Sequence, residues 1–80
     1  MTDVRKLTSG ENPQDPNNNV VLTEVERPGQ EPEYTVTVLI DRSAVSVGGP
    51  FTSLEEAIRQ ASEAAQHYNL EPVYLRRERM

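Results

Sequence analysis

Apolar and polar residues alternate most clearly over residues 33–41, EYTVTVLID. The alternation places its larger apolar side chains on one face of an extended segment: Tyr34, Val36, Val38 and Ile40. The other face is mainly threonine and aspartate, with Leu39 among them. This pattern is typical of a strand in a sheet that is covered on one side only.

Two further strands are predicted on either side of this segment. Residues 20–26, VVLTEVE, are rich in branched side chains, and the polar stretch 27–32, RPGQEP, contains the Pro-Gly pair of a turn. Residues 44–47, AVSV, form a short strand that follows a turn at DRSA. We expect 33–41 and 44–47 to pair as a hairpin.

The apolar period then changes to that of a helix over residues 54–68. Its inner face consists of Leu54, Ala57, Ile58, Ala61, Ala64, Ala65 and Tyr68. Because most of this face is alanine, the helix can lie close to the sheet. We expect Leu54, Ile58 and Tyr68 to supply most of its core volume.

The stretch 48–57, GGPFTSLEEA, could be a glycine-rich phosphate loop or a helix start. Thr52 with Glu55 forms a capping box, and Ser53 with Glu56 offers the same pairing one residue later. Either pairing uses the free amide donors, and two glutamates repel an anion. We therefore predict that Gly48-Gly49-Pro50 ends a strand and turns the chain.

The end of the helix is marked by Asn69, which tolerates the left-handed conformation, and by Pro72, which prevents continuation. Residues 72–78, PVYLRRE, alternate again as a last strand, with Val73 and Leu75 on one face. The prediction is an α+β fold: a small β-β-β-α-β domain in which one helix packs on one face of a mainly antiparallel sheet of three or four strands.

Residues 1–19 differ from the rest of the chain. The stretch SGENPQDPNNN has no apolar residue, and such a composition buries too little surface to offset the entropy of ordering. We expect a flexible N-terminal arm over 1–19 and a single small domain over 20–80.

The composition of the chain argues against several classes of function. The 80 residues carry a net charge of −5, the wrong sign for a typical nucleic-acid binder or an anionic membrane surface. Cysteine is absent, which excludes disulfides and thiolate metal sites. No apolar run approaches the ~20 residues that span a bilayer, and the N-terminus has no apolar signal region. We expect a soluble, cytoplasmic protein.

Catalytic residues are not evident. The one histidine, His67, lies near the helix C-terminus, where a cation favours the helix dipole. Glu55 and Glu56 are adjacent on the helix and diverge by about 100°, so they do not share a metal ion easily. We therefore expect no enzyme activity, no cofactor and no metal.

The remaining clue is the distribution of charge. Glutamates cluster about the first turn, and arginines gather in the last strand. The candidate partner-binding residues are Glu24, Glu26, Glu31, Glu33, Arg76 and Arg77. The acidic cluster would attract a protein with a basic surface, such as a groove that normally holds nucleic acid. The alternative is a solvated hairpin, or pairing of these glutamates with arginines across strands of the same sheet.

The run from Tyr34 to Tyr68, with its helix start T-S-L-E-E-A-I-x-x-A, resembles the N-terminal half of HicB-type antitoxins. The resemblance covers under half of the chain, and those antitoxins usually add a DNA-binding segment for which no residues remain here. The resemblance implies that such an architecture can serve as a protein-binding inhibitor.

The leading prediction is a non-enzymatic, acidic protein-binding module, an inhibitor of the antitoxin or phage and mobile-element type that acts on a nucleic-acid-handling protein. A second is a homodimeric structural or accessory domain that associates through a sheet edge. A third is a nucleic-acid binder that uses Arg76, Arg77 and Arg79.

Overall fold

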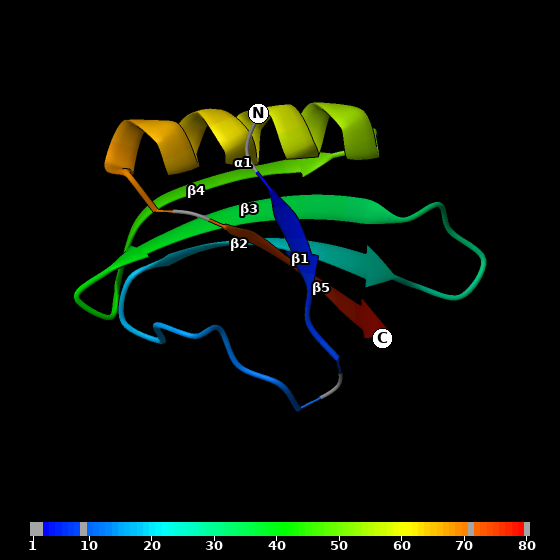
Figure 1. Ribbon diagram of the computed structural model, residues 1–80. Helices are drawn as coiled ribbons and strands as arrows, with labels where there is room; N and C mark the ends of the chain where they lie inside the picture. The colour runs from blue at the N-terminus through cyan, green and yellow to red at the C-terminus, as the bar shows by residue number, and fades with distance from the viewer. Residues whose placement is uncertain (1–2, 9, 71, 80) are drawn as a thin grey trace.

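The computed structural model describes residues 3–8, 10–70 and 72–79. Its elements are β1 (Val4–Lys6), β2 (Asn19–Glu26), β3 (Glu33–Ile40), β4 (Ser43–Phe51), α1 (Leu54–Tyr68) and β5 (Val73–Arg79). The strands form one sheet in the order β1-β5-β2-β3-β4, and α1 packs on it (Figure 1). The predicted α+β class with one packed helix is confirmed.

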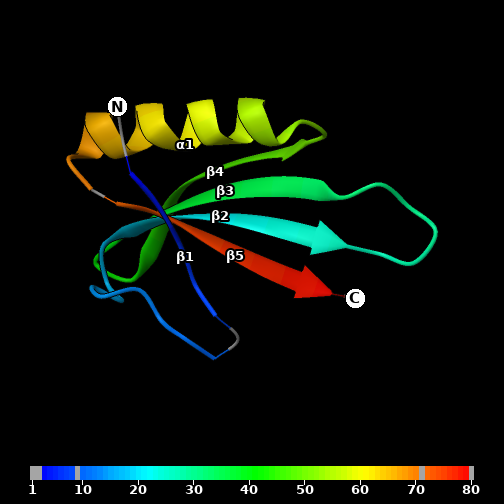
Figure 2. The ribbon, with the colours of Figure 1, turned by 45° about the vertical axis from the view of Figure 1, so that its right-hand side comes forward.

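The sheet differs from the prediction in its number of strands and their directions. It has five strands and is mixed, because β5 runs parallel to both of its neighbours while β2, β3 and β4 pair antiparallel. The parallel pairs arise because α1 carries the chain from β4 back across two strands to the far side of β2 (Figure 2).

β1 corrects the expectation that no strand precedes Val20. Val4 lies opposite Val73 in the parallel register. Two backbone hydrogen bonds flank the pairing: Leu7 N donates to Leu75 O at 2.9 Å, and Val73 N donates to Asp3 O at 3.0 Å. Residues 3–7 are therefore held at the sheet edge by backbone bonds, which need no hydrophobic periodicity.

Residues 10–18, which precede β2, lie on the side of the sheet away from α1 (Figures 1 and 2). Gln14 N donates to the hydroxyl of the buried Tyr74 at 3.2 Å. Asn17 accepts two bonds from Arg42, one from its backbone N–H and one from Nε, each at 2.9 Å. These contacts tie a segment rich in asparagine and proline to β5 and to the β3–β4 turn.

The core lies between α1 and the facing side of β2, β3 and β5. Cross-strand registers bring its sheet residues together in rows, Val73–Val20–Val38 and Leu75–Leu22–Val36. The predicted inner face of β3 is confirmed, since Tyr34, Val36 and Val38 are buried. Burying a side chain of this size contributes roughly 1.5–3 kcal/mol.

The helix contributes less volume than predicted. Its buried residues are Ala57, Ala61 and Ala65, whereas Leu54 and Tyr68 are 38% and 37% exposed. The expectation that Leu54 and Tyr68 fill the core was therefore wrong. The small alanine side chains bring the helix close to the sheet, so the valines and Tyr34 fill the space instead.

Both ends of the helix are capped by residues that the sequence predicted for this role. Ser53, the later of the two capping candidates, is the N-cap, and its Oγ accepts from Glu56 N at 3.4 Å. Asn69 adopts the left-handed conformation at φ 57°, and Leu70 N donates to Ala65 O at 2.8 Å. Both ends thereby satisfy backbone groups that lack partners within the helix.

β4 is longer than predicted, because it continues through Gly48-Gly49-Pro50 to Phe51. The prediction that these residues end the strand was wrong. Gly49 takes φ +109°, and a Cβ atom there would lie 2.7 Å from Tyr34 O. Glycine at this position lets the strand pass an irregular step in its pairing with β3 and still continue.

Candidate protein-interaction surface

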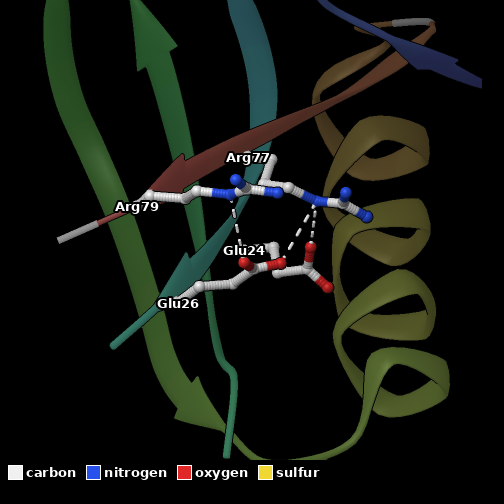
Figure 3. A network of polar contacts seen from close by, with 4 residues as sticks. All are labelled: Glu24, Glu26, Arg77 and Arg79. Atoms are coloured by element: carbon white, nitrogen blue, oxygen red, sulfur yellow. Dashed lines mark hydrogen bonds and ion pairs between the residues drawn. The ribbon is translucent and has the colours of Figure 1, made fainter. Parts of the chain in front are cut away.

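Two strands that are distant in sequence bring the predicted acidic and basic residues together. β2 and β5 pair in parallel, and their register sets Glu24 opposite Arg77 and Glu26 opposite Arg79. Side chains at alternate positions of a strand share a face, so all four project from the same side of the sheet. In Figure 3 the two carboxylates point toward the two guanidinium groups.

The four side chains form a connected network of ion pairs. Arg77 Nε lies 2.6 Å from Glu24 Oε2 and 3.5 Å from Glu26 Oε1, and Arg79 Nε lies 3.4 Å from Glu26 Oε2 (Figure 3). The Glu24 side chain is only 14% exposed, whereas the arginines are largely exposed. The negative charge of β2 is thus neutralised within the sheet.

Tyr34 extends this network toward the core. It lies opposite Glu24 in the β2–β3 register and hydrogen-bonds to that carboxylate. Burial of the ring, together with the charge and hydrogen bond of Glu24, raises the pKa of the Tyr34 hydroxyl above its usual range. The hydrogen bond and charge of Glu24 also raise the pKa of Arg77. Glu24 therefore covers the end of the core and holds Tyr34 in its neutral form.

The other predicted residues are spread over separate parts of the surface. Glu33 pairs with Arg27 across the β2–β3 turn, at 3.2 Å. Glu31 is exposed at that turn, and within the described ranges no ion pair involves it. Arg76 alternates with Arg77 along β5 and so points to the opposite face of the sheet. The structure brings Glu24, Glu26 and Arg77 together, and leaves Glu31, Glu33 and Arg76 apart from them.

The two edges of the sheet are unlike each other. The edge strand β1 has three residues, two of which are the cations Arg5 and Lys6. The other edge strand, β4, has nine residues, SAVSVGGPF, and none is charged. Natural sheets protect their edges with short strands, charges or covering segments. β1 has two of these protections. β4 is long and uncharged, and its protection consists of Pro50 and two irregular steps in its pairing with β3.

The outer side of β4 also exposes apolar side chains. Val45 and Val47 are 47% and 64% exposed, which makes them the two most exposed large apolar residues among those described. A shallow groove runs between β4 and α1 on the helix side. Its lining includes Ser46 and Phe51 from the strand and His67 and Tyr68 from the helix. Val47 lies opposite Thr37, on the face of the sheet away from α1, so the valines and the groove lie on opposite sides of the same edge strand. We call this strand, with its two exposed valines and the groove, the β4 surface.

The β4 surface was not predicted from the sequence, because the strand was expected to end at residue 47. The sequence does indicate an uncharged strand here, because residues 43–51 contain no charged residue although charged residues lie on either side of them. Length and charge are two of the properties that decide how well an edge strand is protected.

In residues 3–8, 10–70 and 72–79, no three histidine, cysteine or carboxylate side chains cluster as a metal would require. No helix in this part of the chain has the length and hydropathy needed to cross a bilayer.

Comparison of the chain with protein-family models, with curated proteins and with solved structures gives no match. The resemblance to HicB-type antitoxins rests on the quoted residues alone.

Proposed function

We propose that this chain is a non-enzymatic protein-binding domain whose contact surface is the β4 surface. The single observation that carries the proposal is the nine-residue, charge-free edge strand with Val45 and Val47 exposed. An extended segment of another chain can pair with such an edge through backbone hydrogen bonds, while side-chain contacts add specificity.

The position of the contact surface differs from the sequence-based hypothesis of an acidic hairpin. Three of the four hairpin glutamates are engaged by arginines of the same chain, which favours the alternative of pairing within the sheet. Exposed ion pairs contribute little to binding when their charges are already balanced. That the partner is a nucleic-acid-handling protein inhibited by this chain stays a prediction from the sequence.

The test compares variants of the tagged full chain as bait for the proteins of its source cell. Val47→Lys places a charge on the β4 edge, and Gln30→Lys places the same charge on the exposed β2–β3 turn as a control. We expect binding of the partner to be retained by Gln30→Lys and lost with Val47→Lys. Retention by Val47→Lys together with loss in Glu31→Lys would instead favour the acidic turn.

A further inference from the structure

The short strand β1 covers only part of the edge of β5. The two strands pair over residues 73–75, then diverge, and β5 continues to Arg79 (Figure 2). We infer that the open edge of β5 over residues 76–79 binds an acidic, extended peptide segment of another protein. This contact lies on the other side of the sheet from β4, so it goes beyond the proposed function.

The backbone of β5 shows which groups face this open edge. Leu75 O accepts from Leu7 N at 2.9 Å, so Leu75 directs its backbone groups toward β1. Alternate residues of a strand direct their N–H and C=O groups to the same side, and those of Arg77 and Arg79 therefore point to the open edge. Among residues 3–8, 10–70 and 72–79, none of these four groups has a hydrogen-bond partner.

A cleft lies beside these backbone groups. Residues 76–79 form one side of it, and Leu7, Thr8 and residues 10–12 line the other. Its volume of about 680 Å³ falls within the range of roughly 300–1,000 Å³ that is common for ligand sites. Residues 76–79 extend over about 13 Å, so the edge can pair with about four residues of an added strand.

The chemistry of this edge favours a polypeptide over a nucleic acid. It offers both N–H donors and C=O acceptors, and equivalent groups of Arg77 and Arg79 recur about 7 Å apart, the repeat of an extended strand. A second strand can satisfy both kinds of group through its own backbone. Phosphate oxygens only accept hydrogen bonds, so a nucleic acid backbone would leave the two carbonyl groups unpaired.

Charge favours acidic side chains in that peptide. Arg77 and Arg79 line the cleft on the α1 side of the sheet, and their side chains are 60% and 77% exposed although they pair with glutamates of β2. A guanidinium group has five donors and can bind more than one carboxylate. Carboxylates of an added strand can therefore reach both arginines from the open side.

The two glutamates of the cleft do not occupy this position. Glu11 accepts hydrogen bonds from the N–H and the hydroxyl of Thr8, at 2.8 and 3.2 Å, in the opposite wall. Glu78 alternates with Arg77 along β5 and so lies on the face away from α1, together with Arg76. We therefore expect the acidic residues of the peptide at alternate positions, on the α1 side.

The first experiment uses a short peptide of alternating glutamate and valine with blocked ends, titrated into the isotope-labelled full chain. We expect saturable NMR shifts at residues 76–79 and 10–12. The same peptide with every amide N-methylated keeps the charge but loses its donors, and should not shift residues 76–79. A version with lysine in place of glutamate should also leave them unshifted. Absence of saturable shifts with the acidic peptide, or equal shifts with the N-methylated one, would overturn the inference.

The second experiment compares two substitutions of one residue. Arg79→Pro removes an N–H that faces the cleft, whereas Arg79→Ala removes the same charge and keeps this N–H. We expect Arg79→Pro to bind the acidic peptide about tenfold more weakly than Arg79→Ala, and the NMR spectrum of each free variant checks its fold. Equal binding by both variants would rule out pairing at this edge.

Further outcomes identify a different occupant. Shifts at residues 76–79 that appear on raising the protein concentration without peptide would mean that a second copy fills the cleft. Shifts there with a single-stranded oligonucleotide but not with the acidic peptide would favour nucleic acid. Val47→Lys should bind the peptide as the wild type does, and loss of binding in this variant would place the peptide at the β4 surface. Each of these results would overturn the inference, and only failure of partner capture tests the β4 surface.

Discussion

Arg77 Nε lies 2.6 Å from Glu24 Oε2 and thereby joins two strands that are 53 residues apart in the sequence. Glu24 in turn hydrogen-bonds to the Tyr34 hydroxyl, so one carboxylate serves a surface arginine and a core tyrosine at once. This arrangement assigns Glu24 to the fold rather than to a partner. Reversing its charge would disturb the sheet as well as any binding.

Glu24→Ala should destabilise the protein, because it removes the hydrogen-bond partner of the buried Tyr34 hydroxyl. The expected loss is about 1–3 kcal/mol in the free energy of unfolding, measured by urea denaturation. Glu31→Ala is the matched control, and its exposed position predicts a change within about 0.5 kcal/mol. Equal effects of the two substitutions would contradict the structural role of Glu24.

The raised pKa of Tyr34 predicts a dependence of stability on alkaline pH. Folding favours the neutral hydroxyl, so its contribution is fully present below the unfolded-state pKa of about 10. It is lost as the pH rises through the higher folded-state pKa. We expect the stability of the wild-type protein to fall above this pH, and the stability of Tyr34→Phe to fall less steeply.

Tyrosinate absorbance gives the direct measurement of this titration. The raised pKa of Tyr34 predicts a titration phase above the usual range of a tyrosine hydroxyl, and Tyr34→Phe should remove this phase. A Tyr34→Phe curve that keeps the high-pH phase would show that another group causes it.

Gly49→Ala should be strongly destabilising because its Cβ would lie 2.7 Å from Tyr34 O at φ +109°. Backbone strain of this kind costs about 1–3 kcal/mol. Gly48→Ala is the control on the adjacent residue, where the nearest atom to a Cβ is the Phe51 ring at 3.5 Å, an ordinary contact. Thermal unfolding should show a larger loss of stability for Gly49→Ala than for Gly48→Ala. A similar loss of stability in both variants would contradict the geometry of β4.

The helix–sheet contact predicts that size matters more at Ala61 than at Leu54. Ala61 is fully buried, so Ala61→Leu should overpack the core at a cost of about 1–3 kcal/mol or more. Leu54 is 38% exposed, so Leu54→Ala should cost less than the roughly 2–5 kcal/mol of a buried leucine. Urea denaturation of both variants compares their losses in the free energy of unfolding. A larger loss for Leu54→Ala than for Ala61→Leu would contradict this prediction.

Local patterns predicted the elements well where periodicity was strong. The alternation over residues 33–41 identified β3 and its buried face, and Asn69 marked the end of α1. Both signals depend on side chains close together in the sequence. The β3–β4 turn at DRSA was likewise predicted, and Asp41 and Arg42 adopt the positive φ of such a tight hairpin.

Other features depend on contacts between distant segments, which no local pattern contains. β1 is a short, charged strand held by backbone bonds to β5, so it has no apolar period to detect. The partners of Glu24 and Glu26 follow from the parallel pairing of β2 with β5, and strand order is not encoded locally. β4 continues past Gly49 because this residue adopts φ +109°, and the glycine in the sequence does not by itself indicate that conformation.

The most direct test of the β4 surface is amide hydrogen exchange of the chain in complex with its captured partner, compared with the free chain. We predict that association slows exchange in residues 44–48 and leaves the β2–β3 turn at 27–32 unchanged. Slowed exchange at 27–32, with 44–48 unchanged, would contradict the β4 surface and return the contact to the acidic turn.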